Sequence, residues 1–258
     1  MKFFNVVIPT FNAENTIRRA FYSVAKQTFK DYRLIIVDDL STDKTREELK
    51  KLFNAEVIFL DEKRYNGGTR NVALREYPDA RYTLFLDADD EFVSPTIFQE
   101  IHDFIVANGY PDMVRLPYQK LYESGHLNKL VILDDAGKDI EAVCWSPRVA
   151  CWTKAIKTEL FIPFPENTLN EDVPQHIAQC DNTDTVAWFD KPVVRWYIHG
   201  KSTSHAESPK WKSSAFRYIA DLADMELKHD WARHRRDKKL LCMKRLVFQQ
   251  LDEELNAK

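Results

Sequence analysis

The sequence LFLDADD at residues 84–90 combines a short apolar run with three carboxylates within four residues. An apolar run of this length is typical of a buried β-strand, and the acids then follow at its carboxyl end. Asp87 and Asp89 are two positions apart, so in an extended backbone both side chains point to the same side. Carboxylate oxygens held in this way suit Mg²⁺ or Mn²⁺, which can neutralise a diphosphate. An isolated D-x-D is also common as a solvated acidic turn, so the neighbouring sequence has to decide.

Strand and helix patterns alternate around this stretch over residues 1–115. The expected strands cover residues 6–8, 34–37, 57–60 and 82–86, and the expected helices cover 15–26, a segment after Ser41, 71–75 behind a turn at Gly67-Gly68, and a segment after Ser94-Pro95. This alternation predicts an α/β fold with a doubly wound, mostly parallel sheet and right-handed crossovers. Ligands bind such sheets at the carboxyl ends of the strands. Asp38-Asp39 and the D-x-D pair both stand at such ends, so we expect one ligand site there.

The pattern changes in the second half of the chain. Residues 112–198 suggest short strands with turn signals at 123–126 and 135–138, and two helices are expected after Ser208. The four cysteines show no C-x-x-C spacing, which argues against a zinc site or a redox pair. No apolar run approaches the ~18–20 residues of a membrane span, and the N-terminus has no signal-peptide pattern. These features predict a cytoplasmic protein.

A basic segment at residues 228–245 stands out against the net charge of −3. It contains eight Lys or Arg residues and only two acidic ones. Such a run is most often the solvated face of a helix. It can also bind an anionic partner, here an anionic membrane surface at the inner face of the membrane or DNA.

Five motifs, in this order and spacing, resemble the inverting GT-A glycosyltransferases of family 2. They are VVIPTFNAE at residues 6–14, IVDDLSTDKT at 36–45, GGTRN at 67–71, the D-x-D stretch, and FPE at 164–166 with ED at 171–172. The resemblance covers roughly the first three quarters of the chain. It implies a GT-A glycosyltransferase domain over residues 1–205, followed by a basic helical C-terminal extension over 206–258. It also implies a nucleotide-diphosphate sugar donor such as a UDP-sugar, Mn²⁺ or Mg²⁺ as cofactor, and a hydroxyl acceptor on a glycan or lipid-linked saccharide.

The resemblance also implies roles for individual residues. The expected donor-binding residues are Pro9, Thr10, Phe11, Asp39, Arg70, Asp87, Lys201 and Ser202. The loop of residues 9–11 would lie along the nucleobase, Asp39 would accept an imide N–H, and Arg70 would face the phosphates. Asp89 and His199 are the expected metal ligands, and Asp87 would bind the ribose or a water on the metal. Asp172 is the expected general base, ahead of Glu171.

Several of these residues have a plainer alternative. Asp38-Asp39 can cap the following helix, with Asp38 as the structural member, and Glu171-Asp172 can simply begin a helix at 173–180. Arg70 can be a surface arginine on a short helix. His199 can be a satisfied structural histidine.

Three other functions compete with transfer to a glycan. A phage-type enzyme would act on hydroxylated bases in DNA and would use the basic segment 228–245. A nucleotidyltransferase would need a Gly-rich, basic loop directly after the first strand, where this chain has FNAE at residues 11–14. A catalytically inactive sugar-nucleotide-binding protein would have lost an acid set, and here all of them are present. A glycosyltransferase is therefore the preferred prediction, with the sugar and the oligomeric state left open.

Overall fold

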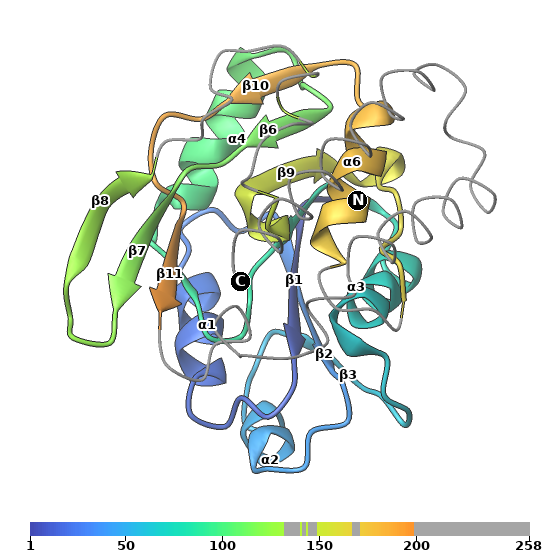
Figure 1. The fold of residues 1–258 in the computed structure, drawn as a ribbon, viewed down its shortest axis with the longest axis vertical. Helices are drawn as coiled ribbons and strands as arrows, with labels where there is room; N and C mark the ends of the chain where they lie inside the picture. Colours follow the sequence, from blue (N-terminus) through green and yellow to red (C-terminus); the bar gives the residue numbers. More distant parts are fainter. Residues whose placement is uncertain (132–139, 141–142, 144–148, 167–170, 199–258) are drawn as a thin grey trace, which may run out of the picture.

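The computed structural model describes residues 1–131, 149–166 and 171–198, with residues 140 and 143 between them. The expected turn at 135–138, the basic segment 228–245 and the extension over 206–258 lie outside the described residues. None of the described helices combines the length and the apolar character that a membrane span requires. Figure 1 shows a central sheet with helices on both faces and a smaller second sheet beside it.

The main sheet has seven strands in the order β10-β6-β9-β4-β1-β2-β3. Its strands are β1 (Lys2–Thr10), β2 (Tyr32–Asp38), β3 (Glu56–Phe59), β4 (Ala80–Phe85), β6 (Met113–Arg115), β9 (Lys154–Lys157) and β10 (Val186–Trp188). β1 pairs in parallel with both β2 and β4, and β9 alone runs antiparallel to its neighbours β4 and β6. The predicted mostly parallel α/β sheet is therefore confirmed.

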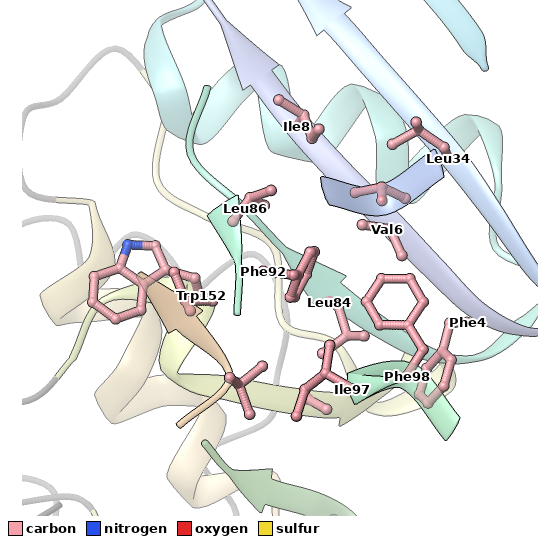
Figure 2. Close-up of a cluster of buried hydrophobic side chains, with 14 of the residues drawn as sticks. Phe4, Val6, Ile8, Leu34, Leu84, Leu86, Phe92, Ile97, Phe98 and Trp152 are labelled. Carbon is pink, nitrogen blue, oxygen red and sulfur yellow. The ribbon is translucent and has the colours of Figure 1, made fainter. Parts of the chain in front are cut away.

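Both faces of this sheet are buried, because neighbouring residues of one strand belong to different apolar clusters. Val6 and Ile8 of β1 pack with α1 (Ile17–Ala25) and α4 (Ile97–Ala107) in the cluster of Figure 2. Val7 instead packs with α3 (Tyr65–Glu76) on the opposite face. Such two-sided burial explains the unbroken apolar runs that marked these strands in the sequence. Further helical segments of the described residues are α2 (Thr45–Leu49), α6 (Asp172–Asp181) and the 3₁₀ turns Cys151–Thr153 and Thr158–Leu160.

The second sheet has the order β5-β11-β7-β8. Its strands are β5 (Glu91–Phe92), β7 (Tyr118–Tyr122), β8 (Leu127–Val131) and β11 (Val194–Ile198). The predicted turn at 123–126 is confirmed, since Tyr122 N–H donates to the His126 carbonyl at 3.0 Å and Gly125 has a φ of 80°. β5 begins directly after Asp90, and β11 pairs with it. This sheet therefore starts at the acidic stretch and returns to it.

Several helix boundaries differ from the sequence prediction. α2 begins at Thr45 and α4 at Ile97, later than Ser41 and Ser94 suggested. Ser41 does not cap α2, because its Oγ accepts the Asn12 N–H at 2.9 Å. Gly67-Gly68 was expected as a turn but lies inside α3. A Cβ at Gly67 would collide with the Pro165 carbonyl oxygen. These glycines therefore permit a close approach between the helix and the segment that precedes α6.

Gly67→Ala should destabilise the protein even though alanine favours helices. The added methyl must push residue 165 away from α3, and overpacking of this kind typically costs about 1–3 kcal/mol. Urea unfolding of the variant measures the loss. Arg75→Ala is the matched control, because the Arg75 side chain is exposed in the same helix and its ion pair within the described part of the chain is with its neighbour Glu76. Unfolding of Gly67→Ala at the wild-type midpoint would show that the close approach is not required.

Candidate active site

Asp38-Asp39 and the acids of the D-x-D stretch lie at the same rim of the main sheet, as the sequence predicted. Thr10, the last residue of β1, pairs with Asp38, the last residue of β2. On the other side of β1, Leu86 N–H donates to the Val7 carbonyl at 3.0 Å, which places the acids after β4 beside the same strand. Parallel strands thus bring residues about fifty positions apart in the sequence to one edge.

Asp38 and Asp39 have different environments. Asp38 is fully buried, and its Oδ2 accepts from Arg46 Nε at 2.5 Å and from the Ser41 N–H at 3.2 Å. These bonds hold the loop that leads into α2, so Asp38 is the structural member of the pair. The Asp39 carboxylate is 5% exposed and turns toward the N-terminus of α3. Its Oδ1 accepts the Arg64 N–H at 2.6 Å, and its Oδ2 pairs with Lys63 Nζ at 3.0 Å.

Two aromatic rings lie near Lys63, the ion-pair partner of Asp39. Pro9 and Thr10, the last two residues of β1, are buried, while the Phe11 ring that follows them is exposed. Lys63 Nζ lies 2.9 Å from the centroid of the Phe11 ring and 5.8 Å from that of the exposed Tyr65 ring. An acceptor near flat, exposed rings is suited to a planar heterocycle that carries an N–H donor.

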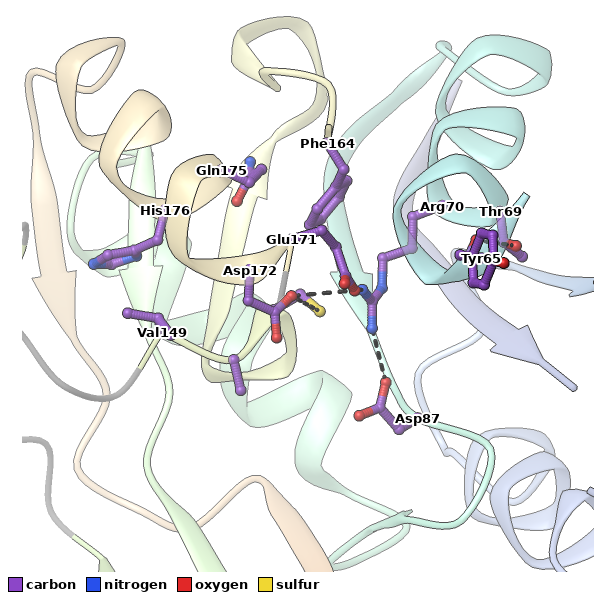
Figure 3. Close-up of polar contacts among 12 residues, drawn as sticks. Tyr65, Thr69, Arg70, Asp87, Val149, Phe164, Glu171, Asp172, Gln175 and His176 are labelled. Carbon is purple, nitrogen blue, oxygen red and sulfur yellow. Dashed lines mark hydrogen bonds and ion pairs between the residues drawn. The ribbon is translucent and has the colours of Figure 1, made fainter. Parts of the chain in front are cut away.

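Arg70 joins the second acid set to the start of α6 (Figure 3). Its side chain is 2% exposed, so it is not a surface arginine. Its Nη2 pairs with Asp87 Oδ1 at 3.0 Å, and its Nη1 pairs with Glu171 and, at 3.5 Å, with Asp172 Oδ1. The guanidinium therefore fixes three carboxylates from two distant parts of the chain around one centre.

Glu171 and Asp172 differ in how open they are. Glu171 is 7% exposed, and burial raises the pKa of its carboxyl to about 7 against the opposing effect of Arg70. Asp172 begins α6 and is 26% exposed. Among the described residues its contacts use Oδ1, which also accepts from Cys151 Sγ at 3.2 Å. Asp172 is thus held on one side while its carboxylate still reaches solvent.

The three acids after β4 differ in their exposure to solvent. Asp87 is 37% exposed and Asp89 is half-buried. Asp90 is buried, and its Oδ1 accepts the Tyr197 N–H at 2.9 Å, which ties the end of β11 to the D-x-D loop. Arg19 strengthens this connection, since it donates to the Asp89 carbonyl and lies 3.5 Å over the Tyr197 ring.

The described residues contain no group of three or more His, Cys, Asp or Glu side chains that could hold a metal alone. Mg²⁺, however, commonly binds one or two carboxylates together with substrate phosphates. Asp87 and Asp89 offer that oxygen set, so the residues present fit such an ion. His199, Lys201 and Ser202 lie outside the described residues, and β11 ends at Ile198 beside the D-x-D loop.

A buried polar group behind Asp172 was not predicted. Lys154 Nζ donates to the Val149 carbonyl at 2.8 Å and lies 3.2 Å from His176 Nδ1. Burial lowers the pKa of Lys154 to about 8, with Arg115 adding to the effect. His176 lies four residues after Asp172 on α6, and Lys154 is the first residue of β9, so these contacts fix the helix against that strand. No sequence pattern marks this contact, because an isolated lysine and histidine have no characteristic spacing.

The sequence model of the family described as Glycosyl transferase family 2 matches residues 5–139. A Bacillus subtilis (strain 168) protein, provisionally assigned as the teichuronic acid biosynthesis glycosyltransferase TuaG, is 37% identical over 224 residues, covering 81% of this chain and 83% of that protein. The Escherichia coli UDP-Glc:alpha-D-GlcNAc-diphosphoundecaprenol beta-1,3-glucosyltransferase WfgD is 33% identical over 99 residues. That match spans 38% of this chain and only 39% of WfgD.

Solved structures share the architecture. Residues 1–349 of Staphylococcus aureus TarS, in complex with UDP-GlcNAc, match with a TM-score of 0.68 and 22% identity over 89% of this chain and 73% of that chain. The Mycobacterium tuberculosis glucosyl-3-phosphoglycerate synthase, with Mg²⁺ and UDP, matches with a TM-score of 0.55 and 18% identity over 87% and 79%. The fold is thus that of the GT-A glycosyltransferases. The chain belongs to glycosyl transferase family 2.

Proposed function

We propose that this enzyme transfers a sugar from a UDP-sugar to a saccharide hydroxyl, with inversion at the anomeric carbon and with help from a divalent metal. The observation that carries the proposal is the Arg70 cluster. Through it, Asp87 from the donor-side loop and Asp172 from the start of α6 face one centre. An inverting transfer needs this arrangement, because leaving group and base act on opposite sides of one sugar.

The donor's base and ribose would lie along the rim of the sheet. The loop of residues 9–11 would follow the nucleobase, and Asp39 would accept the N3–H of uracil beside the Phe11 ring. Arg70 orients Asp87, which would hydrogen-bond to the ribose. Binding of UDP-GlcNAc and UDP by TarS supports this choice of nucleotide, although it is an observation on that protein.

The diphosphate needs positive charge as it leaves. A Mg²⁺ or Mn²⁺ ion held by Asp89, with His199 as the second predicted ligand, would supply it as a Lewis acid. Asp90 holds Tyr197, near the end of β11, next to the D-x-D loop. Lys201 and Ser202 are the predicted phosphate contacts in the segment after β11. Arg70 is also predicted to contribute its charge, from behind the carboxylates that it holds.

Asp172 would act as the general base. Its carboxylate would accept the proton of the acceptor hydroxyl as that oxygen attacks the anomeric carbon from the face opposite the diphosphate. The new glycosidic C–O bond forms while the bond to the UDP oxygen breaks, so the configuration inverts. Glu171 is the weaker candidate, because it is more deeply buried and pairs with Arg70.

The proposed acceptor is a glycan or a lipid-linked saccharide. WfgD, a relative that acts on GlcNAc-diphosphoundecaprenol, supports this choice. A role of the segment 228–245 at an anionic membrane surface, and with it a peripheral location at the inner face of the membrane, stays a prediction. The alternative of DNA as acceptor stays a prediction in the same way.

A screen of sugar nucleotides tests the proposal. Purified full-length protein with Mn²⁺ should slowly hydrolyse UDP-sugars in preference to GDP-, CMP- and dTDP-sugars, and EDTA should stop the reaction. Calorimetry should detect UDP binding under the same conditions. With a suitable saccharide acceptor, NMR of the product should show an anomeric configuration opposite to that of the donor. Absence of both UDP binding and hydrolysis, or a retained configuration, would contradict the proposal.

A further inference from the structure

Lys63 occupies the space that the proposed donor base needs. Its ammonium donates to Asp39 Oδ2 at 3.0 Å and to the Asp39 carbonyl at 3.1 Å, while lying 2.9 Å from the centroid of the Phe11 ring. We propose that Lys63 closes the base pocket of the free enzyme as an internal competitor and is displaced by the nucleobase. This inference rests on the proposed function, which places uracil between Asp39 and Phe11.

The competition follows from which atoms the ammonium touches. A uracil that donates N3–H to Asp39 Oδ2 would lie about 2.8–3.0 Å from that oxygen, the distance of an ordinary hydrogen bond. Lys63 Nζ already stands at this distance and contacts the face of the Phe11 ring on the carboxylate's side. A base that both stacks on that face and bonds to Oδ2 must therefore take the place of the ammonium.

The surroundings of the ammonium are fixed, whereas the ammonium itself can move. Asp39 is anchored through its own N–H, which donates to the Thr10 carbonyl at 2.8 Å, and through the Arg64 N–H on Oδ1. The residues directly after Phe11, Asp39 and Arg64 have left-handed backbone. Their φ angles are 50° at Asn12, 63° at Leu40 and 57° at Tyr65. Strained backbone of this kind persists only where the surrounding structure holds it. The Lys63 side chain is 30% exposed on a flexible stem, so it is the part free to leave.

A physical need explains why a lysine stands there. The Asp39 carboxylate is 5% exposed, and a buried carboxylate without a partner is strongly unfavourable. In the free enzyme Lys63 supplies the partner, and in the complex the imide N–H does. The free enzyme can therefore keep the Asp39 carboxylate in place without leaving its charge unpaired. In exchange, part of the binding free energy of the base is used to displace the ammonium.

The test measures binding of uridine and UDP to Lys63→Met by calorimetry. Uridine is the decisive probe, because it has no phosphate and its affinity does not fall when a positive charge is lost. Lys63→Met should bind uridine roughly three- to tenfold more tightly than the wild type, since the competitor is gone. Lys63→Arg retains a cation and should stay near the wild type. Lys51→Met is the matched control, a solvent-exposed lysine that pairs with Glu48 away from the pocket.

A second readout is thermal stability. Without its cation, ligand-free Lys63→Met should melt below the wild type, and saturating UDP should raise its melting temperature more than it raises that of the wild type. If Lys63→Met does not fold, Lys63→Gln carries the same expectations.

Equal or weaker uridine binding by the variant overturns the inference and leaves the proposed function intact, because the wild type still binds. Failure of the wild type itself to bind UDP or uridine would instead overturn the proposed function, and with it the inference.

Discussion

Asp172→Asn should lower the rate of sugar transfer by ~10²–10⁴, the range typical for loss of a general base. The amide keeps the shape of the side chain and can still accept from Cys151 Sγ, but it cannot take a proton from the acceptor hydroxyl. Donor affinity should hardly change, because the base faces the acceptor and not the nucleotide. The expected result is therefore a fall in kcat at saturating donor with an almost constant Kd for UDP.

Two further variants make this result specific. Asp190→Asn makes the same chemical change at an exposed position after β10 and should leave transfer unaffected. Glu171→Gln removes a charge that pairs with Arg70, so it should act mainly by loosening the cluster, which unfolding experiments detect. A variant of Asp172 that loses UDP binding yet keeps its rate at saturation would show that this carboxylate belongs to the nucleotide site.

The rim of the site was predictable because it depends on local patterns. Buried parallel strands appear in the sequence as short apolar runs, and their carboxyl ends must share one edge. The positions of Asp39 and Asp87 follow from that rule alone. The turn at residues 123–126 was predictable for a similar reason, since Gly125 adopts a backbone conformation that other residues avoid.

What the sequence did not predict depends on contacts between distant residues. Gly67-Gly68 has the local pattern of a turn, but it lies in a helix whose surface is closely approached by the main chain of residue 165. Arg70 was expected to face phosphates, and only the folded chain brings it to Glu171, which is 101 positions away. No motif in the sequence marked Lys63 as a residue of the site. Its position depends on the separate placements of Phe11 and Asp39.

Asp90 shows that, even within a motif, the sequence pattern does not reveal which residues are buried. The three acids after β4 look equivalent in sequence, but Asp90 is buried and holds the Tyr197 N–H, whereas Asp87 and Asp89 reach solvent. The strand β5, which begins at the next residue, forces this division by taking the chain back into the core. One acidic stretch therefore serves both the ligand site and the join between the two sheets.

Asp89→Ala should abolish turnover and remove the dependence of donor binding on a divalent metal, while the fold remains intact. The fold should survive because Asp89 is half-buried, and alanine keeps the main-chain carbonyl that accepts from Arg19. Donor binding should suffer because a diphosphate next to Asp87 and Asp172 meets like charge unless a cation intervenes. UDP titrations with Mn²⁺ and with EDTA give the decisive comparison. The wild type should lose affinity in EDTA, and Asp89→Ala should bind equally weakly in both.

Two controls separate this effect from a general loss of acidic charge. Asp103→Ala removes an exposed carboxylate from α4 and should leave metal dependence unchanged. Asp90→Asn retains an oxygen that can accept the Tyr197 N–H, so it should keep the metal dependence that Asp89→Ala loses. Substantial turnover by Asp89→Ala, or full wild-type activity in EDTA, would rule out the metal role. The charge of the leaving diphosphate would then have to be met by Arg70 and the predicted Lys201, and the acids after β4 would serve only to position the ribose.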